Sequence, residues 1–397
     1  MVHKHDSTHV SNNDGCAVSR SNEAKALGIK MGQPWFECKA LAEDHGILAL
    51  SSNYALYADM SNRVMSILGS FSPRQEVYSI DESFLDLTGM PKLRDVSYEI
   101  RERVRKWTDI PVCVGIGPTK TLAKVANFVA KKHPRSKGVF NYNDLTDAQH
   151  VKLLSQIDVS EVWGVGRRIS ARLSEHGIHS VQDLRVAHAA TLRAEFGVVV
   201  EKTQRELQGI QCMDLEDVVP AKKQIVSSRS FGQTVRDVAV LKDAMSTFVA
   251  NACAKLRAQG SHASLIQVSL HTNRFRKDLP QYNPCLTLPL PQPTNDSLVV
   301  NRWADYLVGY MFKPEYEYKK AGIMLGEITP VGQYQADWLE PVRATDTRLM
   351  DALDELNQRF GRGTVKVSTQ GAHKGWQMRQ ERKSPSYTTD WDEVPVI

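Results

Sequence analysis

Two adjacent carboxylates, Asp81 and Glu82, stand inside the segment YSIDESFLDLTG, residues 78–89. An apolar-polar alternation typical of a β-strand runs through this segment, and a buried strand tolerates two charges only when something compensates them. The usual compensators are a basic side chain or a divalent metal ion. Paired carboxylates that hold Mg²⁺ against phosphate oxygens are the chemistry of nucleotidyl transfer. The alternative for the bare pair is a surface hairpin with two solvated acids.

A hydroxyl, an amide and an ammonium group form a second candidate set nearer the N-terminus. Ser19, Asn22 and Lys25 lie three residues apart, at a short helical pattern that ends at Gly28. Residues at this spacing can share one face of a helix, and such a trio could hold a triphosphate. A solvated helix face is the alternative interpretation.

A basic helix is predicted over residues 120–132, after a strand at residues 112–117 and with Thr119 as its N-cap. In the strand, Gly115 and Gly117 lack side chains, which permits close approach of a ligand or of a neighbouring backbone. A basic stripe that begins beside a helix N-terminus suits phosphate, although a solvated face of an amphipathic helix explains it as well. The stripe consists of Lys120, Lys124 and Lys131.

A turn with two glycines, Trp163-Gly164-Val165-Gly166, separates two helical patterns and is followed directly by Arg167 and Arg168. This arrangement is typical of a helix-hairpin-helix motif, which offers backbone N–H groups to a DNA phosphate without reading bases. A plain turn between helices needs one glycine and no arginines, so the motif is the favoured interpretation.

An α+β domain with one polar sheet face is predicted from Pro220 onward, because a strand pattern, a long helix over residues 237–260 and an alternating strand follow one another. Such a polar, basic sheet face could lie along a duplex backbone, and an ordinary solvated sheet face is the alternative. The basic residues are Arg229, Arg236, Arg274, Arg276 and Lys277.

The last part of the chain starts with GQYQADWLEP, residues 332–341, which is bounded by Gly and Pro. If it is a linker, Gln335, Trp338 and Leu339 are exposed, which suits a short peptide that docks into an apolar groove of another protein. An amphipathic helix over residues 343–360 and a short, basic and aromatic end follow, which we interpret as an adaptor rather than a core.

The overall composition is that of a globular chain. Its 397 residues suffice for two to four domains, and its net charge of +5 is modest although Lys and Arg cluster, which favours a nucleic acid partner. The six cysteines form no CxxC pair, which indicates neither a zinc site nor a disulfide framework. No apolar run approaches the length that spans a membrane, and the first ten residues, predicted to be disordered, do not resemble a signal peptide. A cytoplasmic protein is expected.

Several of these segments together resemble the Y-family translesion DNA polymerases. More narrowly, they resemble the UmuC-type subunit of the bacterial SOS polymerase, polymerase V. The matching segments are SNNDGCAVSRSNEAKALGIKMG, SSNYALYADMSNRV, YSIDESFLDLTG, GIGPTKTLAK, VWGVGRRIS, SRSFG, GRGTVKV and SPSYTT, which run in the family's order from Ser11 to about Thr389.

The resemblance implies an α+β multidomain fold, namely a right-hand polymerase with a ferredoxin-like palm. The implied divisions are a disordered or non-native start (1–10), small fingers (11–55), the palm (56–145), a helix-hairpin-helix thumb (146–218), an α+β little finger (222–330), a linker with a clamp-binding-like peptide (331–341) and a C-terminal UmuC-type domain (342–397).

The resemblance also assigns roles to residues. Asp81 and Glu82 match the second and third catalytic, metal-binding carboxylates, which with a first carboxylate hold two Mg²⁺ ions. The remaining implied roles are triphosphate binding by Ser19, Asn22, Lys25 and Lys131, DNA binding by Gly164, Gly166, Arg167, Arg168, Arg229, Arg274 and Arg276, and clamp binding by Gln335, Asp337, Trp338 and Leu339. The clamp peptide departs from the family's preferred form at Trp338 and Leu339.

The family pattern begins with a strand of the form DxNxFYAxxE, which supplies the first metal-binding aspartate and an aromatic gate against ribonucleotides. No such segment precedes Ser11, and Asp6 lacks the apolar strand and the long spacer that would make it a replacement. We therefore expect impaired catalysis from these 397 residues, and a raw sheet edge in the palm. An in-frame DxNxFYA in the DNA upstream of the Met1 codon would change that expectation.

The function implied by the resemblance is error-prone translesion DNA synthesis in the SOS response to DNA damage, by a magnesium-dependent DNA-directed DNA polymerase, a nucleotidyltransferase. The alternative is a catalytically dead protein that binds DNA and SOS partners. The implied partners are a damaged primer-template, deoxynucleoside triphosphates, a processed UmuD-type dimer, the RecA filament and the β sliding clamp, for a cytoplasmic protein associated with the nucleoid.

Overall fold

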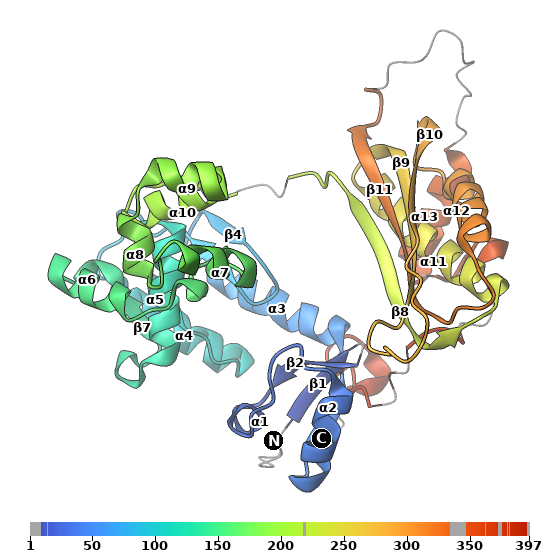
Figure 1. Cartoon of the computed structure of the whole chain (residues 1–397). Coiled ribbons are helices and arrows are strands. Elements are labelled where there is room, and N and C mark those ends of the chain that lie inside the picture. The colour runs from blue at the N-terminus through green and yellow to red at the C-terminus, as the bar shows by residue number, and fades with distance from the viewer. Residues whose placement is uncertain are drawn as a thin grey trace. The chain divides into compact units, whose positions relative to one another are not determined.

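The computed structural model describes residues 9–13, 15–216, 220–333, 347–361, 363–371, 375–378, 380 and 382–394. The chain forms two compact units, each of which is described by itself (Figure 1). Unit 1 comprises residues 1–52 and 220–384, and unit 2 comprises residues 53–219 and 385–397. Among the helices of the described residues, none has the length and apolar character needed to cross a lipid bilayer.

Unit 2 begins with helices and short strands that surround the carboxylate pair. They are α3 (Tyr54–Gly69), β4 (Gln75–Val77), β5 (Ser83–Leu85), α4 (Leu93–Thr108), β6 (Val114–Ile116), α5 (Lys120–Lys132) and β7 (Val139–Asn141). Asn53 caps α3 by accepting a hydrogen bond from the backbone N–H of Leu56, and the buried Val64 and Ile67 of α3 pack against Val104 of α4. The helices form because each has one apolar stripe to bury.

The strands of unit 2 pair two by two. β4 and β5 form an antiparallel hairpin, β6 and β7 form a parallel pair, and no described strand joins the two pairs. The described part of residues 56–145 therefore contains two separate strand pairs. The physical reason is that each pair takes its stabilisation from a helix instead, since α3 packs on the hairpin and α5 packs on β6 and β7.

The backbone of β6 lies directly against α5, and Gly115 makes this possible. A Cβ atom at this position would lie 2.1 Å from the backbone nitrogen of Asn127 and 2.5 Å from the carbonyl oxygen of Ala123. Of the two explanations that the sequence left open for Gly115, approach of a neighbouring backbone is the correct one. The helix itself spans the predicted residues, with Thr119 as N-cap accepting from the backbone N–H of Leu122.

Residues 147–207 of unit 2 are mostly helical. They contain α6 (Asp147–Ser155), α7 (Arg167–Glu175), α8 (Val181–Val186), α9 (Ala189–Phe196) and α10 (Val198–Leu207). Their buried leucines share one apolar core with the inner face of α5, including Leu122, Leu173 and Leu207. The first helical pattern expected before the glycine turn is only a 3-10 turn at residues 159–161.

Unit 1 starts with a three-stranded sheet of order β2-β1-β3. β1 (His9–Asn13) lies between β2 (Cys16–Arg20), which is antiparallel to it, and β3 (Leu48–Ser51), which is parallel. Two short helices accompany the sheet, α1 (Asn22–Ala26) and α2 (Trp35–Asp44). The prediction of disorder through residue 10 is wrong at its end, because the backbones of His9 and Val10 pair with Leu48 and Ala49.

The larger part of unit 1 is the predicted α+β domain. β8 (Ile225–Val235), β9 (Ser261–Thr272), β10 (Cys285–Thr294) and β11 (Tyr318–Pro330) form an antiparallel sheet of order β10-β9-β11-β8. α11 (Val238–Ala258) and α12 (Ser297–Met311) share its apolar core. In β9 the alternating residues Gln267, Ser269 and His271 are half-buried while their neighbours Val268 and Leu270 are buried, so one face is polar as expected.

The C-terminal extension is anchored to this domain. Asp354 of α13 (Arg348–Phe360) binds Arg257 of α11 through two hydrogen bonds of 2.6 and 2.8 Å. Burial lowers the pKa of the Arg257 guanidinium, but the hydrogen bonds and charge of Asp354 outweigh it and raise the pKa overall. Trp376 is only 5% exposed and packs on Phe231 and Phe248. Trp376 is thus part of the core of this domain, contrary to the adaptor interpretation.

Candidate functional site

Asp81 and Glu82 lie in the turn that joins β4 to β5. This segment, residues 78–82, is called the carboxylate turn below. The backbone N–H groups of Tyr78 and Ser79 both donate to the carbonyl oxygen of Glu82, each at 3.1 Å. The expected buried strand through these residues is wrong, because the alternation spans two three-residue strands with a tight turn between them. The turn exposes Asp81 and half-buries Glu82.

The two carboxylates have different partners. Asp81 accepts a 2.7 Å hydrogen bond from the Ser79 hydroxyl, whereas Glu82 forms an ion pair with Lys124 of α5. A basic compensator is therefore present for Glu82, as the sequence required of a buried charge. Two oxygen-ligand groups on an exposed turn fit Mg²⁺, which is commonly held by one or two carboxylates and completed by water and substrate phosphates. In the described part of the chain, no cluster of three or more His, Cys, Asp or Glu side chains is arranged for a metal.

The basic stripe of α5 is largely occupied by carboxylates. Lys120 pairs with Glu76 of β4 at 2.5 Å, and the two side chains are only 10% and 8% exposed. Lys124 binds Glu82, and Lys131 is the one residue of the three that is exposed and has no ion pair with a described residue. The sequence left two interpretations open for Lys120, a phosphate-binding side chain and a solvated one. Neither is correct, because its ammonium is buried against Glu76.

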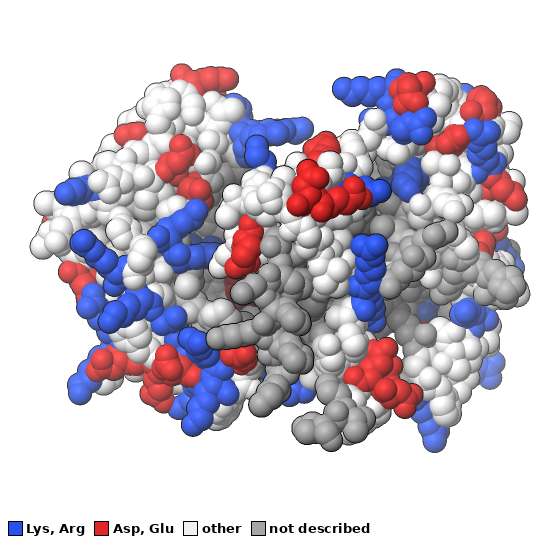
Figure 2. Space-filling model, turned by 90° about the horizontal axis from the view of Figure 1, so that it is seen from below, with Lys and Arg blue, Asp and Glu red and all other residues white. Residues whose placement is uncertain are grey.

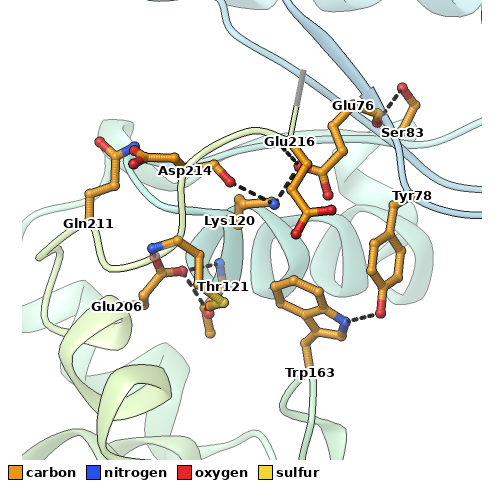
Figure 3. Close-up of polar contacts among 11 residues, drawn as sticks. Glu76, Tyr78, Ser83, Lys120, Thr121, Trp163, Glu206, Gln211, Asp214 and Glu216 are labelled. Atoms are coloured by element: carbon orange, nitrogen blue, oxygen red, sulfur yellow. Dashed lines mark hydrogen bonds and ion pairs between the residues drawn. The ribbon is translucent and has the colours of Figure 1, made fainter. Parts of the chain in front are cut away.

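A pocket of about 480 Å³ opens beside Lys120 and Glu76 (Figure 3). Its other walls are Tyr78, Trp163 and the residues 213–216 that follow the helical part of unit 2. The Glu76 carboxylate accepts a 2.8 Å hydrogen bond from the backbone N–H of Glu216, and the Lys120 ammonium donates to the carbonyl oxygen of Asp214 at 3.1 Å. This ion pair thus fastens residues 214–216 to the hairpin.

A second carboxylate missed by the sequence analysis, Glu206 of α10, is fully buried (Figure 3). One oxygen accepts from the backbone N–H and hydroxyl of Thr121 at 3.0 and 2.9 Å, and the other accepts from the backbone N–H groups of Cys212 and Met213 at 2.9 Å. The carboxylate therefore joins the start of α5 to the end of α10. No local signal marks it, because the segment EKTQRELQG has the composition of a solvated helix face.

The expected triphosphate set is divided between the two units. Ser19 lies in β2, whereas Asn22 and Lys25 lie in α1, so the three do not share one helix face as predicted. The physical reason is that α1 begins only after Ser21, which caps it by accepting from the backbone N–H of Ala24. Lys25 donates to the Asn22 side chain at 3.3 Å, and all three predicted side chains are exposed. The fourth member, Lys131, belongs to unit 2.

The backbone of the glycine turn, residues 163–166, is open to approach from outside. Gly164 has a φ of +88°, and α7 starts directly after Gly166 with no side chain capping its first amides. A Cβ atom at either glycine would meet nothing within 4 Å, and Arg167 and Arg168 are exposed. Val165 between the glycines is 6% exposed and fastens the turn to the helical core.

The basic residues of the α+β domain differ in their environment. Arg229 is exposed on β8. In the loop after β9, Arg274 lies over the Phe275 ring at 4.9 Å, and Arg276 forms hydrogen bonds of 2.6 to 3.0 Å with Asp278. Arg276 therefore carries less free charge than the sequence suggested. On the face drawn in Figure 2, Asp and Glu side chains lie among the Lys and Arg side chains.

The clamp-binding-like residues Gln335, Asp337, Trp338 and Leu339 lie outside the described residues.

Family models match the chain in three stretches. The model of the impB/mucB/samB family matches residues 3–127, and the model of its C-terminal domain matches residues 222–338. Residues 347–397 match a domain of unknown function, DUF4113.

Known proteins extend the match over nearly the whole chain. Protein UmuC of Salmonella typhimurium strain LT2 is 42% identical over 391 residues, covering 97% of this chain and 92% of the relative. The chain belongs to the impB/mucB/samB family. Another relative, Protein ImpB of Salmonella typhimurium, is 41% identical over 393 residues, covering 98% and 92% of the two chains. The resemblance to UmuC-type proteins read from the sequence motifs is confirmed.

The fold agrees with this family. A solved Y-family DNA polymerase chimera built from Dbh and Dpo4 has a TM-score of 0.62 and 20% sequence identity, covering 82% of this chain and 92% of that chain. Because the identity is low, the likeness concerns the fold alone. This member of the impB/mucB/samB family therefore has the fold of a Y-family polymerase, α+β and multidomain as predicted.

Proposed function

We propose that the chain is a DNA-directed DNA polymerase that copies damaged templates in the SOS response. The observation that carries the proposal is the carboxylate turn, a pair of acids on an exposed hairpin beside the Lys124 ammonium, in a chain with the fold of a Y-family polymerase. Family membership supports it, since the relatives include DNA polymerase IV of Moorella thermoacetica, 27% identical over 376 residues that cover 90% of this chain and 88% of the relative.

Asp81 and Glu82 would hold Mg²⁺ in this reaction. The ion supplies positive charge that stabilises the phosphoryl group in transfer. Asp81 is exposed and bound only by the Ser79 hydroxyl among its hydrogen bonds in the described structure, so it accepts a cation without breaking an ion pair. Glu82 would hold the cation in place of Lys124, and the Lys124 ammonium would then be available for a phosphate oxygen.

Ser19, Asn22, Lys25 and Lys131 bind the incoming deoxynucleoside triphosphate in this proposal. The glycine turn, with Arg167 and Arg168, binds the duplex backbone, and Arg229, Arg274 and Arg276 add contacts from the α+β domain. Support comes from the exposure of Arg167 and Arg168 and from the free first turn of α7. We assign the fingers, palm, thumb and little finger to residues 11–55, 56–145, 146–218 and 222–330.

Further partners follow from the same family. They are a processed UmuD-type dimer, the RecA filament and the β sliding clamp, the last bound through residues 335–339. A cytoplasmic, nucleoid-associated protein would meet all three.

Replacing Asp81 and Glu82 by alanine is expected to lower primer extension on an abasic template at least about 100-fold, because the variant cannot hold the cation against the developing phosphate charge. The measurement is product length on a gel over hours, with Mg²⁺ and all four deoxynucleoside triphosphates, so that slow synthesis remains visible.

The matched control is Asp95→Ala with Glu102→Ala, two exposed acids of α4 in the same unit. The proposal is wrong if the carboxylate-turn variant and the control extend primers equally well. Extension by neither the parent nor the variants, with duplex binding retained by all, would favour the alternative of a non-catalytic protein that binds DNA and SOS partners.

Arg167→Ala with Arg168→Ala is expected to weaken duplex binding for every sequence tested and to reduce the slope of log K against log salt by about 2, because each arginine neutralises about one phosphate. Fluorescence anisotropy with two unrelated duplexes at several salt concentrations measures this. Arg105→Ala with Lys106→Ala, on the exposed end of α4, serves as the charge-matched control. An unchanged salt slope would remove the glycine turn from the duplex interface.

A further inference from the structure

An aromatic residue flanks the carboxylate turn on each side, and both aromatic rings contact Trp163, which begins the glycine turn. The Trp163 indole N–H donates to the Tyr78 hydroxyl at 3.2 Å, and the two ring centroids lie 5.2 Å apart at 85° (Figure 3). The Phe84 ring lies 5.7 Å from the Trp163 ring and 6.0 Å from the Tyr78 ring. Tyr78 stands before the two carboxylates and Phe84 after them, so Trp163 contacts both sides of the turn.

Apart from the rings, the turn is held by the Lys124–Glu82 ion pair and by a hydrogen bond from α3. Its hairpin has three residues in each strand, and a two-stranded hairpin is marginal by itself. The hydrogen bond from α3 is donated by the Ser61 hydroxyl to the carbonyl oxygen of Ile80 at 2.5 Å. The Trp163 ring meets Tyr78 edge to face and Phe84 at a tilt of 47°, and aromatic pairs of this kind each shift an equilibrium roughly two- to tenfold. The three rings are therefore a main determinant of where Asp81 and Glu82 lie.

The backbone on either side of Trp163 contacts the helical core. Its neighbours Val162 and Val165 are 3% and 6% exposed in the helical core, and the backbone N–H of Val165 donates to the carbonyl oxygen of Val162 at 2.9 Å. Gly164 and Gly166, where the proposed function seats a DNA phosphate, follow directly in the chain. A displacement of this glycine turn therefore displaces the indole that rests against the carboxylate turn.

We propose that Trp163 is a positioning residue that couples the duplex-binding glycine turn to the Asp81 and Glu82 carboxylates. Duplex binding at Gly164 and Gly166 fixes the Trp163 backbone, and its ring then holds Tyr78 and Phe84 so that the turn adopts one conformation. The duplex-binding role of the glycine turn rests on the proposed function. The ring contacts that transmit the coupling are observed in the structure. Through this coupling, a bound primer-template determines whether Asp81 and Glu82 adopt a single conformation.

Hydrogen exchange of the Tyr78 and Ser79 amides reports the state of the turn, because both donate to the carbonyl oxygen of Glu82. In the free protein, Trp163→Ala is expected to speed their exchange about tenfold and Trp163→Phe less, since phenylalanine retains a ring and loses the N–H. Trp107→Ala is the matched control, because Trp107 is 66% exposed on α4 of the same unit, and no change is expected there.

Saturating primer-template is then added to each variant. We expect it to slow exchange at Tyr78 and Ser79 in the parent and in Trp107→Ala, but not in Trp163→Ala at equal duplex occupancy. Equal protection in Trp163→Ala would overturn the coupling, and so would unchanged exchange in the free Trp163→Ala protein. Faster exchange throughout α8 to α10 in Trp163→Ala would mean that this variant disturbs the helical core. The Trp163→Phe variant then tests the coupling. We expect it to lose part of the duplex-dependent protection at Tyr78 and Ser79, and full protection would contradict the proposal.

The outcome is separable from that of the proposed function. If no primer is extended but duplex-dependent protection passes through Trp163, the coupling stands and the polymerase assignment fails. If primers are extended while the Trp163 variants show parental exchange with and without duplex, the polymerase assignment stands and the coupling fails. Absence of duplex binding in the parent contradicts both.

Discussion

Gly115→Ala is expected to destabilise unit 2 by at least about 3 kcal/mol. The added Cβ would lie 2.1 Å from the backbone nitrogen of Asn127 and 2.5 Å from the carbonyl oxygen of Ala123, so β6 must leave α5. Both obstacles are backbone atoms inside a helix, and neither can turn aside as a side chain would. For a unit of this size the loss corresponds to a fall in melting temperature of roughly 6–12 °C, measurable by calorimetry.

The control for Gly115→Ala is Gly166→Ala. Gly166 has a φ of −83°, which alanine adopts, and a Cβ there would meet nothing within 4 Å. We expect its melting temperature to stay within about 2 °C of the parent, since surface changes of this kind cost little. A parental melting temperature for Gly115→Ala would mean that β6 and α5 are not in backbone contact.

Glu206→Ala is expected to cost about 3–5 kcal/mol, since it leaves buried donors without an acceptor. The lost acceptor serves the N–H and hydroxyl of Thr121 and the N–H groups of Cys212 and Met213. Besides lowering the melting temperature, the change should release residues 211–216. Faster hydrogen exchange at the Cys212 and Met213 amides would record that release.

Glu206→Gln separates charge from shape at this position. Glutamine keeps one acceptor oxygen but sets its NH₂ group against two of the donors, so an intermediate loss of stability is expected. Glu175→Ala, an exposed glutamate at the end of α7, is the matched control and should leave stability within about 0.5 kcal/mol. If Glu206→Ala resembles that control, the buried carboxylate does not join α5 to α10.

Local pattern was sufficient for elements whose partners are close in the sequence. The helix α5 spans residues 120–132 as predicted, because Thr119 caps it and one apolar stripe, including Leu122 and Val125, must be buried. The long helix and alternating strand of the α+β domain follow from the same periodicities. Asp81 and Glu82 could also be singled out, because an acid pair inside a strand-like pattern needs a compensating charge.

Prediction from residue spacing failed where a turn or a helix cap interrupts the regular spacing of a strand or helix. The alternation from Ser79 to Leu85 predicts one strand, yet a five-residue turn lies between β4 and β5 and places Asp81 at the surface. Ser19 shares its spacing with Asn22 and Lys25 but lies in β2, because the helix starts only after its cap at Ser21. Spacing alone does not reveal where a helix begins.

The sequence by itself determined the family, the α+β character and the chemical types available for phosphate and cation binding, since these depend on residue identity and order. Only the tertiary structure decided which charges neutralise one another. Glu76 meets Lys120 across 44 positions, Glu206 meets Thr121 across 85, and Trp163 meets Tyr78 across 85. Such contacts depend on how helices and hairpins pack, and burial then determines which side chains remain free for a ligand.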